Sequence, residues 1–164
     1  MDEKVEEWLE KIKKSKDNMA DLSRDEDLSI GIMNLISLEE HMFFSYAKTG
    51  HARYLDMLDS LRKMRVEMMQ KIVKDPSAED WCISKHLLAA SMRFIEVGTK
   101  ELKRGKRSEA ESYFNSAFEL YSLFFAINLK ILDKKEKEEI RQMGDKTSIF
   151  GQMVKKILDC CKEW

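Results

Sequence analysis

The stretch LSIGIMNLISLEEHMFFSYA, residues 28–47, decides the fold of this chain. Drawn as an α-helix, it places six apolar side chains on one face: Leu28, Ile32, Leu35, Met42, Phe43 and Tyr46. Glu39 falls in the middle of that face. Because an unpaired buried charge is very costly, the pattern predicts an opposite charge that faces Glu39 from another helix.

The next amphipathic stretch, residues 52–74, supplies that charge. Its apolar side chains repeat with the helical period and form one stripe: Tyr54, Met57, Leu58, Leu61, Met64, Met68 and Ile72. Arg65 lies at the centre of the stripe. If the chain folds back at Thr49-Gly50, Glu39 lies opposite Leu61, one turn from Arg65, and a guanidinium can span that gap. We therefore expect a buried Glu39–Arg65 ion pair between antiparallel helices.

Asn128 is a further polar residue on an apolar face, that of the last long helical stretch. The preferred prediction is one buried polar network of Glu39, Arg65 and Asn128 that fixes the register of the helices. A functional pocket built on the same residues and a set of separately satisfied sites are the two alternatives.

Composition favours one domain of long, solvated helices. The 164 residues are 36% charged and 43% hydrophobic, with 1 Pro and 6 Gly. A net charge of −1 gives no global field for nucleic acid or an anionic membrane, and no apolar run approaches membrane-spanning length. The start of the chain lacks the apolar region of a signal peptide. An odd set of three cysteines favours a reducing cytosol, so we expect a cytoplasmic protein.

Every segment between turn signals has a 3.6-residue period, which predicts a single all-α domain over 1–164, folded as an antiparallel bundle. Its core is expected at about 24–132, with amphipathic terminal helices at 3–16 and 147–163. These terminal helices either dock on the bundle, which we slightly prefer, or form a homodimer seam. Helix starts are predicted at three capping patterns, Ser23-x-x-Glu26, Ser77-x-x-Asp80 and Ser108-x-x-Glu111, and helix ends at Gly50 and Gly105.

Residues 91–124 carry a local motif. Phe94-x-x-Val97-Gly98, followed by Ala110, Phe114 and Ala117, resembles the tetratricopeptide helix pair. The resemblance implies a close helical hairpin, since Gly98 and the two alanines permit near approach. Glu101 stands where that pattern has Tyr, and no second copy lies 34 residues away, so a repeat protein is not implied.

A wider resemblance covers residues 28–128. The wording Leu38-Glu39-Glu40-His41, Arg62-x-x-Arg65 and WCISKHLLAASMR at 81–93 resembles a group of small, uncharacterised helical proteins from archaea and bacteria. The resemblance implies an all-helical fold and brings no activity with it.

Cys82, His86, Arg93 and Glu96 share the polar face of one helix and form the candidate functional face. A thiol and an imidazole four residues apart suit a metal site or a nucleophilic pair, but a zinc site needs about four ligands. The preferred interpretation is therefore an ordinary solvated helix surface; a polar groove covered by another helix and a metal or nucleophilic site are the alternatives. We predict no bound metal and no cofactor.

Two other patterns bear on function. Glu39-Glu40-His41 lacks the Glu-x-x-His spacing of di-iron carboxylate bundles, which disfavours an oxidoreductase of that class. A basic turn precedes the helix expected from Ser108 and contains Lys103, Arg104, Lys106 and Arg107. We prefer to interpret it as an ordinary solvated turn; the alternative is a local site for an anion or RNA. It lacks interleaved aromatic residues, so RNA binding is weakly supported.

Three functions remain in order of preference. The first is a non-enzymatic helical interaction or scaffold protein with a protein partner or a second copy of itself. The second is a small metal- or thiol-dependent enzyme that uses the face of Cys82 and His86. The third is an anion- or RNA-binding module at 100–107.

Overall fold

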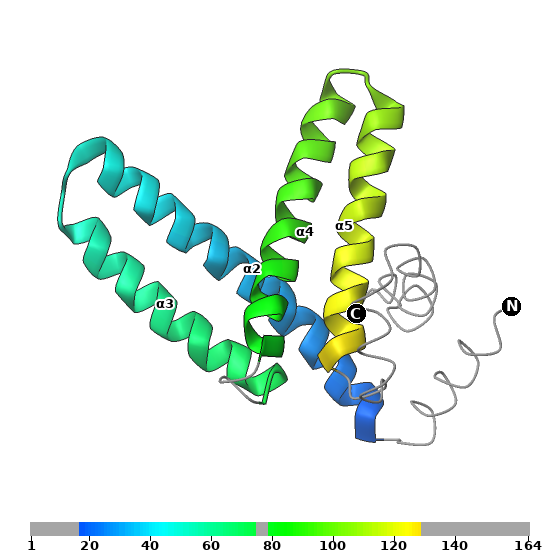
Figure 1. Ribbon diagram of the computed structural model, residues 1–164, viewed down its shortest axis with the longest axis horizontal. Helices are drawn as coiled ribbons and strands as arrows, with labels where there is room; N and C mark the ends of the chain where they lie inside the picture. Colours follow the sequence, from blue (N-terminus) through cyan, green and yellow to red (C-terminus); the bar gives the residue numbers. More distant parts are fainter. Residues whose placement is uncertain (1–16, 75–78, 129–164) are drawn as a thin grey trace, which may run out of the picture.

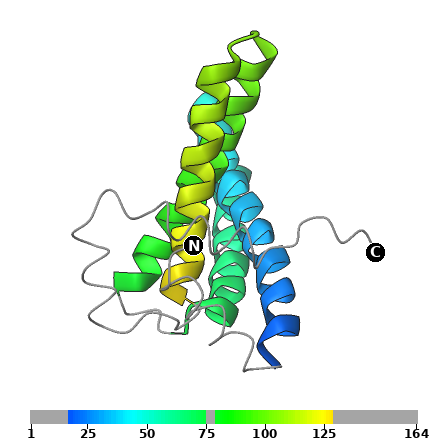
Figure 2. The same cartoon turned by 90° about the vertical axis from the view of Figure 1, so that its right-hand side faces the viewer.

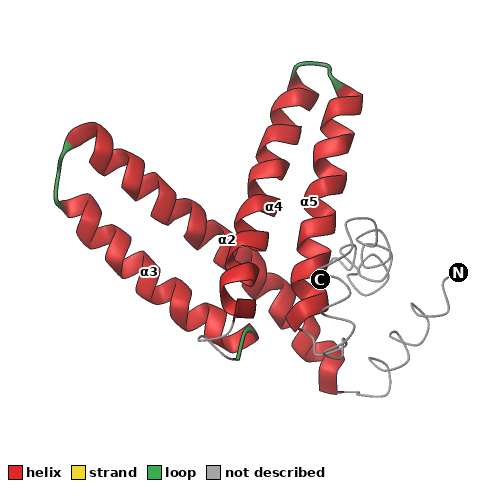
Figure 3. Cartoon of the chain, viewed as in Figure 1, coloured by secondary structure: helices red, strands yellow, loops and turns green. Residues whose placement is uncertain are grey.

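A computed structural model describes residues 17–74 and 79–128, which form four long helices (Figure 1). They are α2 (Asp17–Thr49), α3 (Arg53–Ile72), α4 (Glu79–Lys103) and α5 (Arg107–Asn128). These ranges contain no strand (Figure 3), which confirms the all-α prediction. The terminal helices expected at 3–16 and 147–163 lie outside the described residues. No helix in the described ranges is long and apolar enough to cross a membrane.

The four helices pair as two antiparallel hairpins, and a glycine ends the first helix of each. Gly50 (φ 69°) follows α2, and its N–H donates to the carbonyl of Tyr46 at 2.8 Å. Gly105 (φ 78°) lies two residues after the end of α4, and its N–H donates to the carbonyl of Leu102 at 3.0 Å. Glycine reaches this left-handed backbone conformation without a steric penalty, so both predicted breaks are confirmed.

Two of the three predicted helix starts differ from the structure. Ser23 and Glu26 lie inside α2, which already runs from Asp17, so the capping box predicted there is wrong. Ser108 is the second residue of α5 and not the residue before it. Short capping patterns match by chance inside helices, because serine and glutamate also occur on solvated helix faces. Ser77, the third predicted cap, lies outside the described residues.

The hairpins converge at one end and diverge at the other. In Figure 1 the turn between α2 and α3 and the turn between α4 and α5 point in different directions, while the start of α2 crosses the lower halves of α4 and α5. Figure 2, turned by 90°, shows α4 and α5 rising together from that crossing. We call the region where α2 crosses α4 and α5 the base. The arm is the part of the α2–α3 hairpin beyond it, residues 37–67.

The hydrophobic core lies in the base, where all four helices contribute. Its buried members are Ile32, Met33, Met69, Ile72, Val73, Leu87, Leu88, Phe124, Phe125 and Ala126. The rings of Phe124 and Phe125 meet edge to face at 5.2 Å, as do those of Tyr121 and Phe125 at 5.1 Å. Tyr121 and Ser29 also share a 2.7 Å hydrogen bond between α5 and α2. The shared core therefore joins the two hairpins into one bundle.

The α4–α5 hairpin is closely packed. A Cβ added to Gly98 would lie 2.7 Å from the ring of Phe114, while Ala110 and Ala117 are 0% and 2% exposed. The small residues expected to permit near approach do so. Ser91 reinforces this contact by donating to the carbonyl of Ala117 at 2.8 Å. The resemblance of this hairpin to the tetratricopeptide helix pair remains a prediction.

The arm corrects the predicted burial of four residues. Phe43, Tyr46, Met57 and Met64 were expected on inward stripes, yet they are 53%, 36%, 47% and 51% exposed. Among the described helices, α3 alone covers α2 in the outer part of the arm, so side chains at the edges of each stripe have no third described helix over them. Periodicity gives the direction of a side chain but not the width of the surface that covers it.

Candidate functional site: the cleft between α2 and α4

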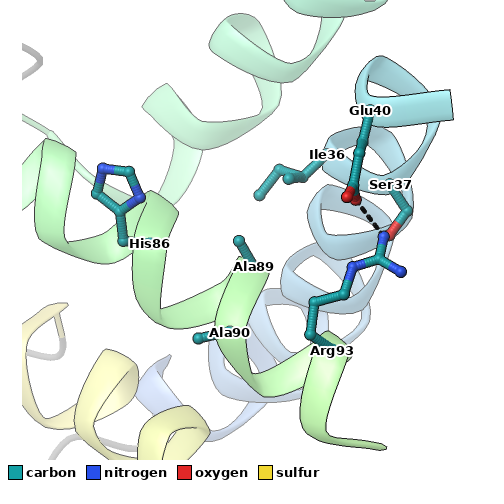
Figure 4. A pocket seen from close by; sticks show the side chains of 7 residues that line it. All are labelled: Ile36, Ser37, Glu40, His86, Ala89, Ala90 and Arg93. Carbon is teal, nitrogen blue, oxygen red and sulfur yellow. Dashed lines mark hydrogen bonds and ion pairs between the residues drawn. The ribbon is translucent and has the colours of Figure 1, made fainter. Parts of the chain in front are cut away.

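A cleft of about 440 Å³ opens where the arm leaves the base. Residues of α2 and α4 line it: Ile36, Ser37, Glu40, His86, Ala89, Ala90 and Arg93. Figure 4 shows Ile36 and Ala89 projecting into the space, with His86 at one end and Glu40 and Arg93 at the other. The cleft therefore has an apolar floor between two polar ends.

Arg93 organises the polar end through two carboxylates. Its guanidinium forms an ion pair with Glu40 of α2 and another with Glu96 of its own helix, the latter at 2.6 Å. All three side chains are about 40% exposed, so the pairs are reached by solvent and each contributes little stability. Two carboxylates against one guanidinium leave this group of three with a net charge of −1.

Cys82 and His86 lie on the same helix face as Arg93, as the sequence predicted. Sγ of Cys82 is 3.9 Å from Nε2 of His86, and both residues are exposed. His86 lines the cleft but Cys82 does not. No group of three or more potential metal ligands occurs among residues 17–74 and 79–128. The arrangement corresponds most closely to the alternative of a polar groove partly covered by another helix.

The predicted Glu39–Arg65 ion pair is present and buried between α2 and α3. Glu39 is 11% exposed and Arg65 7%, and a second contact joins Nη2 of Arg65 to Oε2 of Glu39 at 3.4 Å. Arg62, at the rim, also reaches Oε2 of Glu39 at 3.1 Å while its own side chain is 57% exposed. One carboxylate thus holds two arginines of α3.

Asn128 belongs to a different contact. Its amide donates to Oγ of Ser84 in α4 and to the carbonyl of Phe124, both at 2.8 Å. Within the described part of the chain no hydrogen bond joins it to Glu39 or Arg65. The prediction of one network of Glu39, Arg65 and Asn128 is therefore wrong, and the alternative of separately satisfied sites holds. The reason is that Asn128 lies in the base while the ion pair lies in the arm.

The basic turn between α4 and α5 is balanced by carboxylates. Arg104 pairs with Glu101 at 2.7 Å and Arg107 with Glu111 at 3.0 Å. Lys106 pairs with Glu109 at 3.1 Å and lies 3.7 Å from Oε2 of the buried Glu101, an oxygen without a hydrogen bond. Lys103 is exposed, and no ion pair joins it to another described residue. Local neutralisation weakens the case for an anion site here.

Sequence reasoning missed Glu40 as a site residue. Its side chain points away from the apolar stripe that carries Glu39 and toward a second neighbour, Arg93 of α4. Ile36, Glu40, Phe43 and Ala47 recur at helical spacing, and this second stripe was the available signal that α2 has two partners. The position of α4 beside that stripe depends on how the hairpins cross, which the local pattern does not contain.

The cleft continues along the arm as an exposed aromatic surface. Phe43 lies two turns beyond Ile36 and Phe44 one turn beyond Glu40, so both continue the wall that α2 gives to the cleft. They are 53% and 59% exposed, and their rings meet at 5.2 Å. On α4, the half-buried Val97 lies two turns beyond Ala90. We call the cleft and these three residues the interhairpin groove.

No protein-family model matches this chain, and neither a curated protein nor a solved structure does. The wider resemblance to small archaeal and bacterial helical proteins stays a prediction.

Proposed function

We propose that this protein is a non-enzymatic helical interaction protein, and that the interhairpin groove receives an amphipathic helix of a protein partner. The observation that carries the proposal is the exposed pair Phe43 and Phe44, which follows along α2 from a cleft lined by Ile36, Ala89 and Ala90. Large aromatic side chains exposed beside a concave apolar surface are typical of sites that bind partner helices.

The charges of the groove define the partner further. Arg93 is shared by Glu40 and Glu96, so the polar end favours a positively charged side chain. A lysine or arginine there would replace part of the Arg93 contact to one carboxylate, while its aliphatic stem packs on the cleft floor. The expected partner helix therefore has apolar anchors at spacings i, i+4 and i+7 and a basic residue on the same face.

Selection from a library of random 20-residue peptides tests the proposal. We expect enriched peptides to share this spacing and to bind a Phe43→Ser/Phe44→Ser variant at least tenfold more weakly. The matched control is Met57→Ser/Met64→Ser, which removes side chains of similar exposure from α3. Binding unaffected by the phenylalanine change, or lost equally in both variants, would contradict the groove as the binding site.

The rival function, a thiol- or metal-dependent enzyme, draws on the 3.9 Å separation of Cys82 and His86. It predicts stoichiometric metal in the purified protein that is lost on Cys82→Ser. The interaction function predicts that Cys82→Ser leaves peptide binding unchanged, since Cys82 does not line the cleft. We place either function in the cytoplasm, where free thiols persist.

A further inference from the structure

The interhairpin groove has the length of a short helix. On α4 it runs from His86 to Val97, which are 11 residues apart and therefore about 16 Å apart along the helix axis. Its floor is apolar, and the group of Glu40, Arg93 and Glu96 carries a net charge of −1. An occupant of this groove therefore needs about three turns of helix, an apolar stripe and a positive charge.

Residues 146–157 of the same chain have that pattern. They lie outside the described ranges, and their sequence is KTSIFGQMVKKI, with three lysines and no acidic residue. Phe150, Val154 and Ile157 have the spacing i, i+4 and i+7, which places all three on one face of a helix. Lys146 lies four residues before Phe150 and falls on the same face. As a helix this segment would be about as long as the groove.

We propose that segment 146–157 docks as a helix in the interhairpin groove of its own chain. The inference rests on the proposed function of the groove and adds its regulation, because a partner helix must displace the segment before it can bind. The apolar face of the segment packs between α2 and α4 beside Phe43 and Phe44, and its lysines face the excess carboxylate of the Glu40–Arg93–Glu96 group.

The place where α5 ends allows this contact. The amide of Asn128, its last residue, donates to Oγ of Ser84 at 2.8 Å, so the chain leaves α5 beside the part of α4 that carries His86. Residues 129–145 then separate Asn128 from the segment, and these 17 residues would span about 25 Å even if all were helical. A helix with its side chains is about 10–12 Å across, so the chain can pass round α4 and enter the cleft.

The opposite end of the chain does not fit the groove. Residues 5–12 also have apolar side chains at helical spacing, but Ile12 is five residues from Asp17, and an extended chain covers at most about 18 Å over that distance. Ile36, the first groove residue of α2, lies about 28 Å from Asp17. A helix over 5–12 would therefore end near the level of Ile36. Its three glutamates and one lysine also repeat the charge of the groove.

The tether makes even a weak contact effective. A linker of this length holds the segment at an effective concentration on the order of 1 mM. If the free segment binds with a dissociation constant of about 0.1 mM, the groove is occupied about 90% of the time, and the apparent affinity for a partner falls about tenfold.

Fluorescence anisotropy of a labelled synthetic peptide of residues 146–157, added to the full chain, tests the contact. Val154→Glu/Ile157→Glu in the protein puts two carboxylates on the docked face, so we expect this opened chain to bind the peptide about tenfold more tightly than the native chain does. Ser148→Glu/Gln152→Glu adds the same charge on the opposite face of the segment and should bind the peptide as the native chain does.

Two further variants identify the site and the occupant. Adding Phe43→Ser/Phe44→Ser to the opened chain should remove the gain in peptide affinity, because these rings belong to the groove. Trp8→Glu/Ile12→Glu should not open the groove, because residues 5–12 do not reach along it.

A variant with an intact apolar face keeps the test decisive. Lys155→Glu/Lys156→Glu reverses the charge of the segment, and we expect it to raise peptide affinity at least threefold in a way that also depends on Phe43 and Phe44. It replaces Val154→Glu/Ile157→Glu if circular dichroism shows that the latter has lost helicity.

Four results would overturn the proposal. They are equal peptide affinity of the native and opened chains, a gain that survives Phe43→Ser/Phe44→Ser, an equal gain in Trp8→Glu/Ile12→Glu, and a fall from two 19.3 kDa chain masses to one on opening, measured by light scattering. The last result would mean that a second copy supplies the segment.

Failure of this inference is distinct from failure of the proposed function. Library-selected peptides that bind the native and opened chains equally, and need Phe43 and Phe44 in both, would refute the docked segment and retain the function. Selected peptides that bind the opened chain without needing Phe43 and Phe44 would contradict the groove as the binding site.

Discussion

Glu39 of α2 and Arg65 of α3 form an ion pair that is almost completely removed from solvent, with side chains 11% and 7% exposed. The pair lies between two helices that no third helix of residues 17–74 and 79–128 covers in the outer arm. Its position explains how a hairpin with so many exposed apolar residues keeps one register, since shifting either helix by a turn would leave both charges buried without a partner.

Removing Glu39 should destabilise the protein strongly. Glu39→Ala leaves the Arg65 guanidinium buried without its carboxylate, and we expect the free energy of unfolding to fall by about 3–5 kcal/mol. Urea denaturation followed by circular dichroism measures the change. Arg62→Ala removes the exposed partner of the same carboxylate and should cost less than about 1 kcal/mol.

The double change Glu39→Leu/Arg65→Met separates the cost of an orphaned charge from the value of the pair. Replacing both charges by apolar side chains leaves nothing unsatisfied, so the double variant should be more stable than Glu39→Ala. A double variant that is less stable than the single one would show that the attraction itself dominates.

Two glycines inside helices should respond in opposite directions to alanine. Gly31→Ala meets no atom within 4 Å and removes backbone freedom from the unfolded chain, so stability should rise by about 0.5–1 kcal/mol. Gly98→Ala places a Cβ 2.7 Å from the Phe114 ring and should destabilise by about 1–3 kcal/mol. Thermal unfolding of the two variants side by side checks both signs; equal shifts would contradict the close contact of α4 with α5.

Tyr121→Phe should loosen the connection between the hairpins. The change removes the hydroxyl that bonds Ser29 across the base, and we expect a loss of about 0.5–1.5 kcal/mol. The variant keeps the ring and its edge-to-face contact with Phe125. Tyr46→Phe, at an exposed position in the arm, is the matched control and should be neutral within about 0.5 kcal/mol.

Lys106 should titrate above the ordinary lysine range. Its hydrogen bond to Glu109, followed by the attraction of Glu109 and Glu101, raises its pKa in the folded protein. A raised lysine pKa contributes stability below the unfolded pKa of about 10.5, and this contribution is lost as pH rises through the folded pKa. Glu109→Gln should lower the pKa of Lys106, and Glu119→Gln should leave it unchanged. NMR titration of the lysine side chain between pH 9 and 12 measures both.

The sequence predicted what local patterns determine. The helical period, the breaks at Gly50 and Gly105 and the pair of Glu39 with Arg65 all follow from residues within one hairpin. Only one assumption was needed for the ion pair, namely that a short turn brings the helices antiparallel.

Contacts between the hairpins were not predictable in the same way. Glu40 and Arg93 are 53 positions apart and meet because α2 crosses α4 at one angle among several that helix packing allows. The exposure of Phe43, Met57 and Met64 has the same origin, since burial depends on which helices cover the arm. The candidate face of Cys82, His86, Arg93 and Glu96 was predicted, with a groove covered by another helix as one alternative, but the sequence did not indicate that α2 is the covering helix.

The arm described above also permits a change of length. Its outer part contacts the rest of the described chain only through the base, and its two helices run side by side to the turn at Gly50. Seven residues added to both α2 and α3 would lengthen the arm by about 10 Å while returning every side chain to nearly the same direction. Homologous chains could therefore differ in arm length by whole heptads, with the base unaltered, and the reach of the protein would vary while its fold did not.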